Sequence, residues 1–452
     1  MLKAWALGVV GAILVAGSGC RGEGRASLRR IDSGPGDGGR EDAGFDGGAS
    51  DAGRDGGTVD GGSDGGAADA GGLGRWVPLG FALGRDAQTY PVLTLDPSGV
   101  VYLAFAAVAE ASGTELRVMR WSGSSWTPVG GVVTSSALRF PYSEPLWLGL
   151  ATDATGHPLV AFGDSGPDSG TGIFPLKTWA LDGGVWVSVP VPGGAAILNG
   201  LSLVRGADGS VRLAVASDGQ LQLWGLGPTG WTEVASTLQA PADAGVNQPD
   251  LALAGDGTPV VVFDTARVAG EVGALRVARW TDGGWNDLGL PSPGGGETVF
   301  YGPRVLVRSD GGVVVAAAQW LREAQSHLQS GVAVPILSLG FGGWATAAIA
   351  TPPGGSGLSE PVVGAPLGLA LQKDTPVIVY TDRDGGTELR ALMDGGVDVA
   401  LAPRLEGVMA GTLLLDSTGM PLVAGVTPLT ILDAGLPAVD GGAIEVLKVL
   451  PP

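Results

Sequence analysis

One unit of about 53 residues recurs along most of the chain, and this repetition limits the possible folds more than any other feature. The clearest copies begin with PVLTLDPSGVVYLAF at Pro91–Phe105 and PDLALAGDGTPVVVF at Pro249–Phe263. One acidic residue marks the first turn of each copy, and the six gaps between Asp96 and Asp416 average about 53 residues. The markers are Asp96, Asp153, Asp208, Asp256, Asp310, Asp374 and Asp416.

Each unit contains four short apolar segments, and the third and fourth are joined by a turn that is flanked by tryptophan, as at Trp121 and Trp126. The apolar segments are rich in β-branched residues, as expected of strands that are buried on both faces. Asp and Gly suit the first turn, because Asp accepts hydrogen bonds from nearby amides and Gly adopts positive φ. Four strands per repeat at this period predict an all-β, seven-bladed β-propeller, with six or eight blades as alternatives.

The two ends of the repeat region complement each other. The sequence RWVPLG at Arg75–Gly80 matches a fourth strand with no unit before it, and AIEVLKVL at Ala443–Leu450 matches a third strand with no fourth strand after it. We expect Trp76–Gly80 to pair with Ile444–Leu450 and close the ring, because an unpaired sheet edge invites aggregation. The tryptophans near the third and fourth strands are expected to pack between blades.

The repeat units resemble the degenerate propeller repeats of sialidase-like and related exported bacterial proteins, many of which are lipoproteins. The resemblance spans nearly all of residues 75–452 and implies the fold, but no specific activity. The Gly-His and Trp-Asp signatures of WD40 repeats are absent, and the sialidase Asp-box is matched only in its Asp and Gly. The arginine-bearing stretch typical of sialidases is also absent.

The first 20 residues, MLKAWALGVVGAILVAGSGC, contain Lys3, then an apolar run, then small residues that end at Cys20. About 14 apolar residues are too few to span a bilayer, and this layout is typical of an export signal. The segment resembles a bacterial lipoprotein signal, which implies cleavage after residue 19 and lipidation of Cys20. We therefore expect a signal peptide over 1–19 and a lipid anchor in the cell envelope, at the outer membrane, with secretion as the alternative.

Residues 20–74 are predicted to form a disordered linker. The stretch consists mainly of DGG and DAG units with an Asp at every fourth or fifth position from Asp32 to Asp69, and between these two residues Phe45 and Val59 are the only large apolar candidates for a core. A regular spacing of Asp and Gly also occurs in β-rolls that bind calcium. Those rolls need an apolar residue in every turn, which this stretch does not supply. Glycine and repelling carboxylates favour a flexible tether with a reach on the order of 40 Å. The domain organisation is thus 1–19, 20–74 and a propeller over 75–452.

Charge and composition exclude several classes of partner. A net charge of −19 and a pI of about 4.4 argue against nucleic acid, which requires a basic surface. One Cys excludes an internal disulfide framework, and two His exclude a His-rich metal site. No cofactor motif is present, since no phosphate-cradling glycine loop joins a strand to a helix. We expect a monomer with neither a cofactor nor a nucleic-acid partner.

Candidate catalytic residues all lack the partners that their chemistry needs. Gly163–Gly166 is similar to the nucleophile stretch of trypsin-like proteases, but serine needs a base, and His157 is expected to fill a turn instead. The elbow-like GGSDG around Ser63 lies in the predicted linker, which cannot supply the strained turn of that motif. Paired carboxylates remain open as calcium ligands, although solvated loop charges are commoner: Asp164 with Asp168, and Asp382 with Asp384.

We therefore expect no catalytic residues and a propeller that binds a protein or glycan through variable loops between second and third strands, where binding usually resides. These loops are 106–114, 163–175, 264–273, 319–331 and 381–387. The alternatives are a carbohydrate-active enzyme of the sialidase or lyase type and a structural envelope component. A central pocket lined by several arginines and carboxylates would favour the enzyme, and a shallow neutral face would favour binding.

Overall fold

A computed structural model describes most of the repeat region as β-structure. The described residues are 73–87, 89–108, 114–135, 148–164, 174–193, 196–197, 199–217, 219–240, 245–266, 274–289, 298–322, 329–340, 343–350, 367–382, 386–393, 397–427 and 442–451. They form 29 strands, and no helix occurs among them. Within this described part, no helix is therefore long and apolar enough to cross a membrane.

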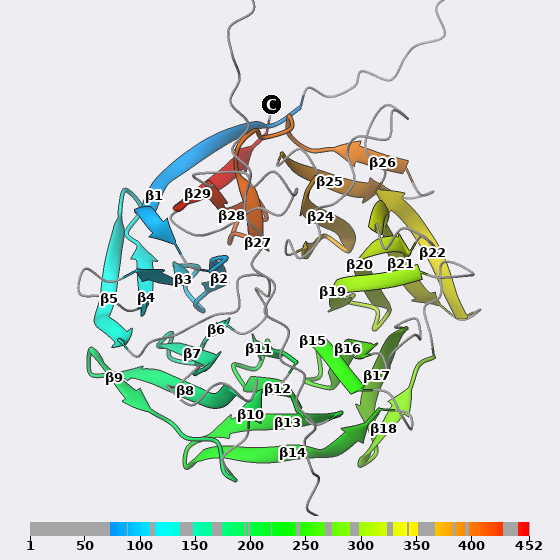
Figure 1. Ribbon diagram of the computed structural model, residues 1–452, viewed down its shortest axis with the longest axis horizontal. Coiled ribbons are helices and arrows are strands. Elements are labelled where there is room, and N and C mark those ends of the chain that lie inside the picture. Colours follow the sequence, from blue (N-terminus) through cyan, green and yellow to red (C-terminus); the bar gives the residue numbers. More distant parts are fainter. Residues whose placement is uncertain are drawn as a thin grey trace, which may run out of the picture. The chain divides into compact units, whose positions relative to one another are not determined.

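The strands group into seven antiparallel four-stranded blades around a common axis, which confirms the predicted all-β propeller (Figure 1). Blade 1 comprises β2 (Val92–Leu95), β3 (Val101–Val108), β4 (Thr114–Trp121) and β5 (Trp126–Thr134); blade 2 comprises β6 (Leu148–Thr152), β7 (Pro158–Gly163), β8 (Phe174–Asp182) and β9 (Val185–Ser188); blade 3 comprises β11 (Leu201–Arg205), β12 (Val211–Ser217), β13 (Gln220–Gly227) and β14 (Gly230–Gln239). The short β10 (Ala196–Ile197) adds to the sheet of blade 2 by pairing with β8.

The remaining blades repeat this meander. Blade 4 comprises β15 (Gly245–Leu253), β16 (Pro259–Ala266), β17 (Leu275–Thr281) and β18 (Gly284–Asp287); blade 5 comprises β19 (Thr298–Val307), β20 (Val313–Arg322), β21 (Gln329–Gly340) and β22 (Gly343–Ala350); blade 6 comprises β23 (Gly368–Gln372), β24 (Thr375–Thr381), β25 (Thr387–Met393) and β26 (Val397–Ala400); blade 7 comprises β27 (Met409–Leu415), β28 (Pro421–Thr427), β29 (Gly442–Leu450) and β1 (Arg75–Ala87). The first strand of each blade lies nearest the axis (Figure 1).

The ring closes as the sequence predicted, because β1 supplies the outer strand of blade 7. It pairs antiparallel with β29, so that Trp76 lies opposite Val449 and Pro78 lies opposite Leu447. The pairing runs further than expected, to the end of β1, where Ala87 also pairs with Ala107 of β3. This last contact joins blades 7 and 1 into one eight-stranded sheet.

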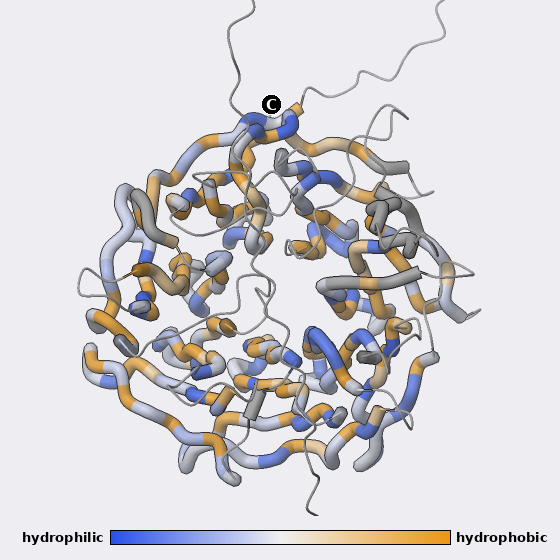
Figure 2. The backbone as a smooth tube through the Cα atoms, viewed as in Figure 1, coloured by the Kyte–Doolittle hydropathy of each residue, from blue (hydrophilic) through white to orange (hydrophobic). Residues whose placement is uncertain are grey.

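The hydrophobic core lies between neighbouring blades. The cluster between blades 1 and 2 contains Ala104 and Val118 from one blade and Val160 and Phe162 from the other, all at most 1% exposed. In Figure 2 apolar positions recur along the strands of every blade. Because each sheet is covered on both faces, its central strands are continuously apolar, which is why VVYLAF and PVVVF lack the alternation of half-exposed strands.

The acidic markers form the first turn of each blade, as predicted. Asp96 Oδ1 accepts hydrogen bonds from the amides of Ser98 and Val100 at 2.8 and 2.9 Å. Asp153 and Asp416 accept the same two amide bonds. Asp208, Asp256 and Asp310 stand two positions later in their turns and accept only from the amide two residues further on. Asp374 departs from this pattern, because its tight two-residue turn places it at φ +65° and its carboxylate accepts from Ser309 of blade 5 instead.

Tryptophans bridge the blades, as expected. In five blades the Trp near the start of the fourth strand donates its indole N–H to the preceding blade or to the segment that follows it. The pairs are Trp186 to Val129 O, Trp231 to Thr178 Oγ1, Trp285 to Ser236 O, Trp344 to Leu288 O and Trp76 to Pro403 O, at 2.7–3.0 Å. In blade 1, the Trp126 indole N–H has no hydrogen-bond partner among the described residues.

Candidate functional site: the axial pocket

All seven blades contribute to one pocket of about 260 Å³ at the axis, here called the axial pocket. Its lining comes from the innermost strands and the residues just before them. Alignment of the repeats places one equivalent position from each blade in this lining: Val92, Gly149, Ser202, Asp250, Arg304, Gly368 and Thr412. The residues on either side of these positions are mostly Leu, Val or Pro. The polar side chains of the pocket are therefore those of Ser202, Asp250, Arg304 and Thr412 at the equivalent positions, together with Tyr90.

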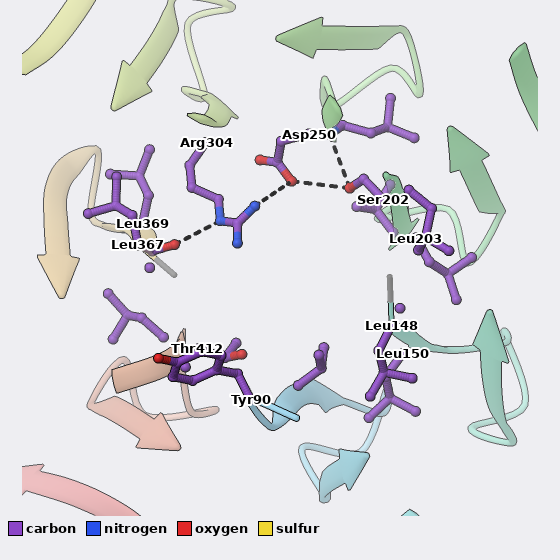
Figure 3. A pocket seen from close by; sticks show the side chains of 18 of the residues that line it. Tyr90, Leu148, Leu150, Ser202, Leu203, Asp250, Arg304, Leu367, Leu369 and Thr412 are labelled. Carbon is purple, nitrogen blue, oxygen red and sulfur yellow. Dashed lines mark hydrogen bonds and ion pairs between the residues drawn. The ribbon is translucent and has the colours of Figure 1, made fainter. Parts of the chain in front are cut away.

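The walls of the axial pocket are largely leucine. Figure 3 shows Leu148, Leu150 and Leu203 on one side and Leu367 and Leu369 on another. These side chains are at most 8% exposed, because each also packs into the core between two blades. The leucine walls are therefore rigid, because their positions are set by the same packing that holds the blades together.

A polar chain crosses four blades on one side of the pocket (Figure 3). Ser202 Oγ donates to Asp250 Oδ1 at 3.1 Å and accepts from the amide of Leu251 at 3.2 Å. Asp250 Oδ2 accepts from the amide of Val305 at 2.9 Å, and Arg304 Nη1 lies 3.8 Å from Asp250 Oδ1. These side chains accept hydrogen bonds from amides on the free edges of the innermost strands. Buried amides need such partners.

The chain continues from Arg304, whose Nε donates to Leu367 O of the next blade at 2.8 Å. Thr412 Oγ1 similarly donates to Pro91 O across the seam between blades 7 and 1, at 2.7 Å. At two other positions glycine is required for close approach. A Cβ on Gly149 would lie 2.6 Å from Leu203 Cβ, and one on Gly368 would lie 2.5 Å from Leu413 Cβ. Six of the seven positions therefore contact the next blade by a hydrogen bond or by close approach, and the seventh, Val92, packs against the core between blades 1 and 2.

Burial perturbs the acidic groups of the pocket. It raises the pKa of Asp250 above the usual range, although Arg304, the Val305 amide and Ser202 each act to lower that pKa. Burial also raises the pKa of the Tyr90 hydroxyl, so this phenol stays protonated at neutral pH. Among the residues that line the pocket, Arg304 is the only cation and Asp250 the only carboxylate.

A second charged cluster lies between blades 6 and 7. Arg404 donates from Nε and Nη2 to the two oxygens of fully buried Asp382, at 2.5 and 2.8 Å, and the Gly386 amide adds a bond of 2.9 Å. The amide of Thr387 donates to Leu405 O. These contacts fix the segment between β26 and β27 to blade 6, which is a structural role.

The site residues predicted from the sequence do not line the axial pocket. Cys20, Asp168 and Asp384 lie outside the described residues, as do most of the variable loops. Asp382 pairs with Arg404, and no group of three or more His, Cys, Asp or Glu that could hold a metal occurs within the described part. His157 lies in its predicted turn, where its amide donates to Asp153.

Sequence reasoning missed the axial pocket. The site residues predicted from the sequence do not include Asp250, Arg304 or Tyr90. The signal was present in the repeats, because alignment of the copies shows Leu-Ser-Leu, Pro-Asp-Leu, Pro-Arg-Val and Leu-Gly-Leu at one site, with the middle residue varying between apolar neighbours. A charged residue at the middle position of an otherwise apolar first strand predicts a polar side chain at the axis of the propeller.

No protein-family model and no curated protein matches this chain. Among solved structures, the chain is similar to a polysaccharide lyase, an ulvan lyase, with a TM-score of 0.57 and 11% identity over 83% of this chain and 96% of that chain. A saccharide-bound structure of an ulvan lyase has a TM-score of 0.55 and 11% identity over 83% of this chain and 96% of that chain. A protein of unknown function from Dyadobacter fermentans gives 0.46 at 14% identity over 84% and 100%. The two lyase structures, with TM-scores above 0.5 at 11% identity, support the propeller fold alone.

Proposed function

We propose that this protein is a lipid-anchored propeller of the cell envelope that binds a protein or glycan without transforming it. The observation that carries this proposal is that both charged side chains of the axial pocket are hydrogen-bonded to neighbouring blades. Asp250 accepts hydrogen bonds from Ser202 and Val305, and Arg304 donates to Leu367 O, so both side chains connect neighbouring blades. Side chains fixed in this way can recognise a ligand, but they are poorly placed to exchange protons with one.

Acid–base catalysis on a glycan needs two groups with separate roles, one that accepts a proton and one that donates it. The axial pocket offers one carboxylate, and its raised pKa is offset in part by Arg304. Tyr90 keeps its proton at neutral pH because burial raises the pKa of its phenol, so it cannot accept a proton and is a weak proton donor. The pocket also lacks the several arginines that the enzyme hypothesis requires, which supports binding as the principal role.

The alternative function is a carbohydrate-active enzyme. The observation that favours it is the presence of Arg304, Asp250 and Tyr90 in one pocket of a fold shared with a polysaccharide lyase. In such an enzyme an arginine would neutralise a substrate anion and a tyrosine would transfer a proton. Product analysis separates this alternative from simple binding, because a binding module releases its ligand unchanged.

The anchor and tether complete the proposal. Lipidation of Cys20, followed by the Gly- and Asp-rich stretch to residue 74, would hold the propeller clear of the membrane surface. Labelling of cells with a fatty-acid analogue tests the anchor, with Cys20→Ala as the matched control. We expect label on the wild-type chain only, and equal labelling of both proteins would refute the anchor.

Screening tests the binding function itself. The full chain is applied to a glycan array and to a pull-down from envelope extracts, in parallel with Arg304→Gln in the pocket and Arg276→Gln as a control. Arg276 forms an exposed ion pair with Asp287 on the outer part of blade 4, so this control removes the same charge away from the axis. We expect a ligand that is retained by wild type and Arg276→Gln and lost by Arg304→Gln. Retention by all three proteins would place binding outside the pocket.

A further inference from the structure

The guanidinium of Arg304 has one open side. Its Nε donates to Leu367 O at 2.8 Å, and its Nη1 lies 3.8 Å from Asp250 Oδ1, which is beyond hydrogen-bond distance. Within the described residues, its Nη2 has no hydrogen-bond partner. The side chain is 22% exposed and faces the axial pocket (Figure 3). Nη1 and Nη2 together form a fork that matches the two oxygens of a carboxylate.

The rest of the pocket has a different character. The guanidinium faces a space enclosed by Leu148, Leu150, Leu203 and Leu369, and Tyr90 and Thr412 lie on the far side (Figure 3). Because the Thr412 hydroxyl donates its proton to Pro91 O, it has no proton left to donate to a ligand. A ligand in this space would therefore have one anionic end at Arg304 and an apolar body against the leucines.

Asp250 competes with such an anion for the guanidinium of Arg304. Its two oxygens already accept from Ser202 and Val305, so it retains partners when the Arg304 guanidinium binds a ligand. Burial raises the pKa of Asp250, which eases uptake of a proton when a second negative charge enters the pocket. The pocket can therefore accept an anion without leaving two unpaired carboxylates side by side.

We infer that the axial pocket binds a small monocarboxylate with an apolar body, its carboxylate on the Nη1–Nη2 fork of Arg304 and its body against the leucine walls. This inference rests on the proposed binding function and names the chemical class of its ligand. It applies equally to a free acid and to the carboxyl end of a short apolar peptide, since both present the same group. Hexanoate and the tripeptide Ala-Ala-Leu are probes for the two sources.

The test is calorimetric titration of the full chain with hexanoate, Ala-Ala-Leu, hexan-1-ol and hexylamine. We expect one hexanoate or one peptide per chain, about tenfold or more tighter than the alcohol, because a charge-assisted bond to Arg304 is added, and no binding of the amine. Hexanoate alone identifies a free acid, and the peptide alone identifies a chain end. Equal affinity for acid and alcohol, or binding of neither carboxylate, overturns the inference.

Variants locate the site. Arg304→Gln is expected to weaken carboxylate binding about tenfold or more, Arg276→Gln to leave it unchanged, and Asp250→Asn to tighten it because the competing charge is removed. Titration in buffers of different ionisation enthalpy gives a second readout, since wild type is expected to take up a proton on binding and Asp250→Asn is not. Circular dichroism confirms that each variant is folded. Unchanged binding in folded Arg304→Gln contradicts the inference.

The two proposals fail separately. Loss of a glycan or protein ligand in Arg304→Gln, together with no carboxylate binding by wild type, would keep the proposed function and overturn only the ligand class. Carboxylate binding with no retained glycan or protein would support the ligand class and overturn the macromolecular partner.

Discussion

The indole N–H of Trp76 donates to the carbonyl oxygen of Pro403 at 2.7 Å, which ties the strand that closes the ring to the segment that follows blade 6. The adjacent Gly74 amide donates to Leu401 O at 2.9 Å in the same segment. Two residues at the start of the propeller thus contact a segment more than 300 residues later in the chain. Closure depends on these contacts as well as on the ladder between β1 and β29.

Replacement of Trp76 by Phe removes this hydrogen bond and keeps an aromatic ring. We expect a loss of about 1 kcal/mol in the free energy of unfolding, because a hydrogen bond contributes roughly that much net. The matched control is Trp126→Phe, whose buried indole N–H has no partner among the described residues, so its removal is expected to cost little. Urea unfolding followed by fluorescence measures both, and an equal loss in the two variants would contradict the role assigned to the bond.

Deletion of residues 73–80 removes most of the ladder between β1 and β29. We expect loss of the cooperative melting transition or formation of oligomers, because the edge of β29 then becomes free to pair with another chain. The control is deletion of residues 50–57, an equal length of the predicted linker. Differential scanning calorimetry and light scattering report the two effects, and an unchanged transition after the first deletion would refute closure by β1.

Asp416 links the first turn of blade 7 to β29. Burial acts to raise its pKa, but the bond to Lys448 Nζ at 2.5 Å and those from Thr418 outweigh burial and lower the pKa to about 2. Because the folded-state pKa lies below the unfolded value of about 4, the stability from this group is present above pH 4 and is lost as pH falls through about 2.

Asp416→Asn is therefore expected to be less stable than wild type by roughly 2 kcal/mol near pH 6, with the gap closing toward pH 2. Urea titrations across this pH range measure the gap. Asp256→Asn, in the corresponding turn of blade 4 but two residues further along it and exposed, is expected to show a smaller gap. A gap that stays constant from pH 6 to pH 2 would mean that the carboxylate charge is not what stabilises the turn.

Arg404→Met is expected to destabilise the protein by about 3–5 kcal/mol, because it leaves the carboxylate of Asp382 buried without its cation. The double variant Asp382→Leu/Arg404→Met removes both charges and is expected to recover much of that loss. A double-mutant cycle by chemical unfolding measures the coupling. Additive losses in the two single variants would show that the pair does not act as a unit.

The sequence predicted the fold well because each blade repeats the same local signals. The Asp-x-Ser/Thr turn, the continuously apolar second strand and the Trp that opens the fourth strand recur in several copies, so weak evidence in one copy is reinforced by the next. The pairing of Trp76 with Val449 was predictable for the same reason: each end of the chain lacked the strand that the other supplied.

The site was not predictable to the same degree, because it exists only where the blades meet. Ser202, Asp250 and Arg304 are separated by about 50 residues each, and no local pattern indicates that they lie side by side. Only alignment of the repeats brings them to equivalent positions. The orientation of Arg304 toward Leu367 O depends on packing between blades 5 and 6, which no spacing in the sequence specifies.

The most direct test of the central claim is whether the protein leaves a glycan unchanged. The full chain, Arg304→Gln and Arg276→Gln are each incubated with polygalacturonate, alginate and hyaluronan, and the chain lengths are measured by size-exclusion chromatography. We predict that all three polysaccharides keep their length distribution with every protein. Shortened, unsaturated products formed by wild type and Arg276→Gln but not by Arg304→Gln would contradict the account and establish catalysis at the axial pocket.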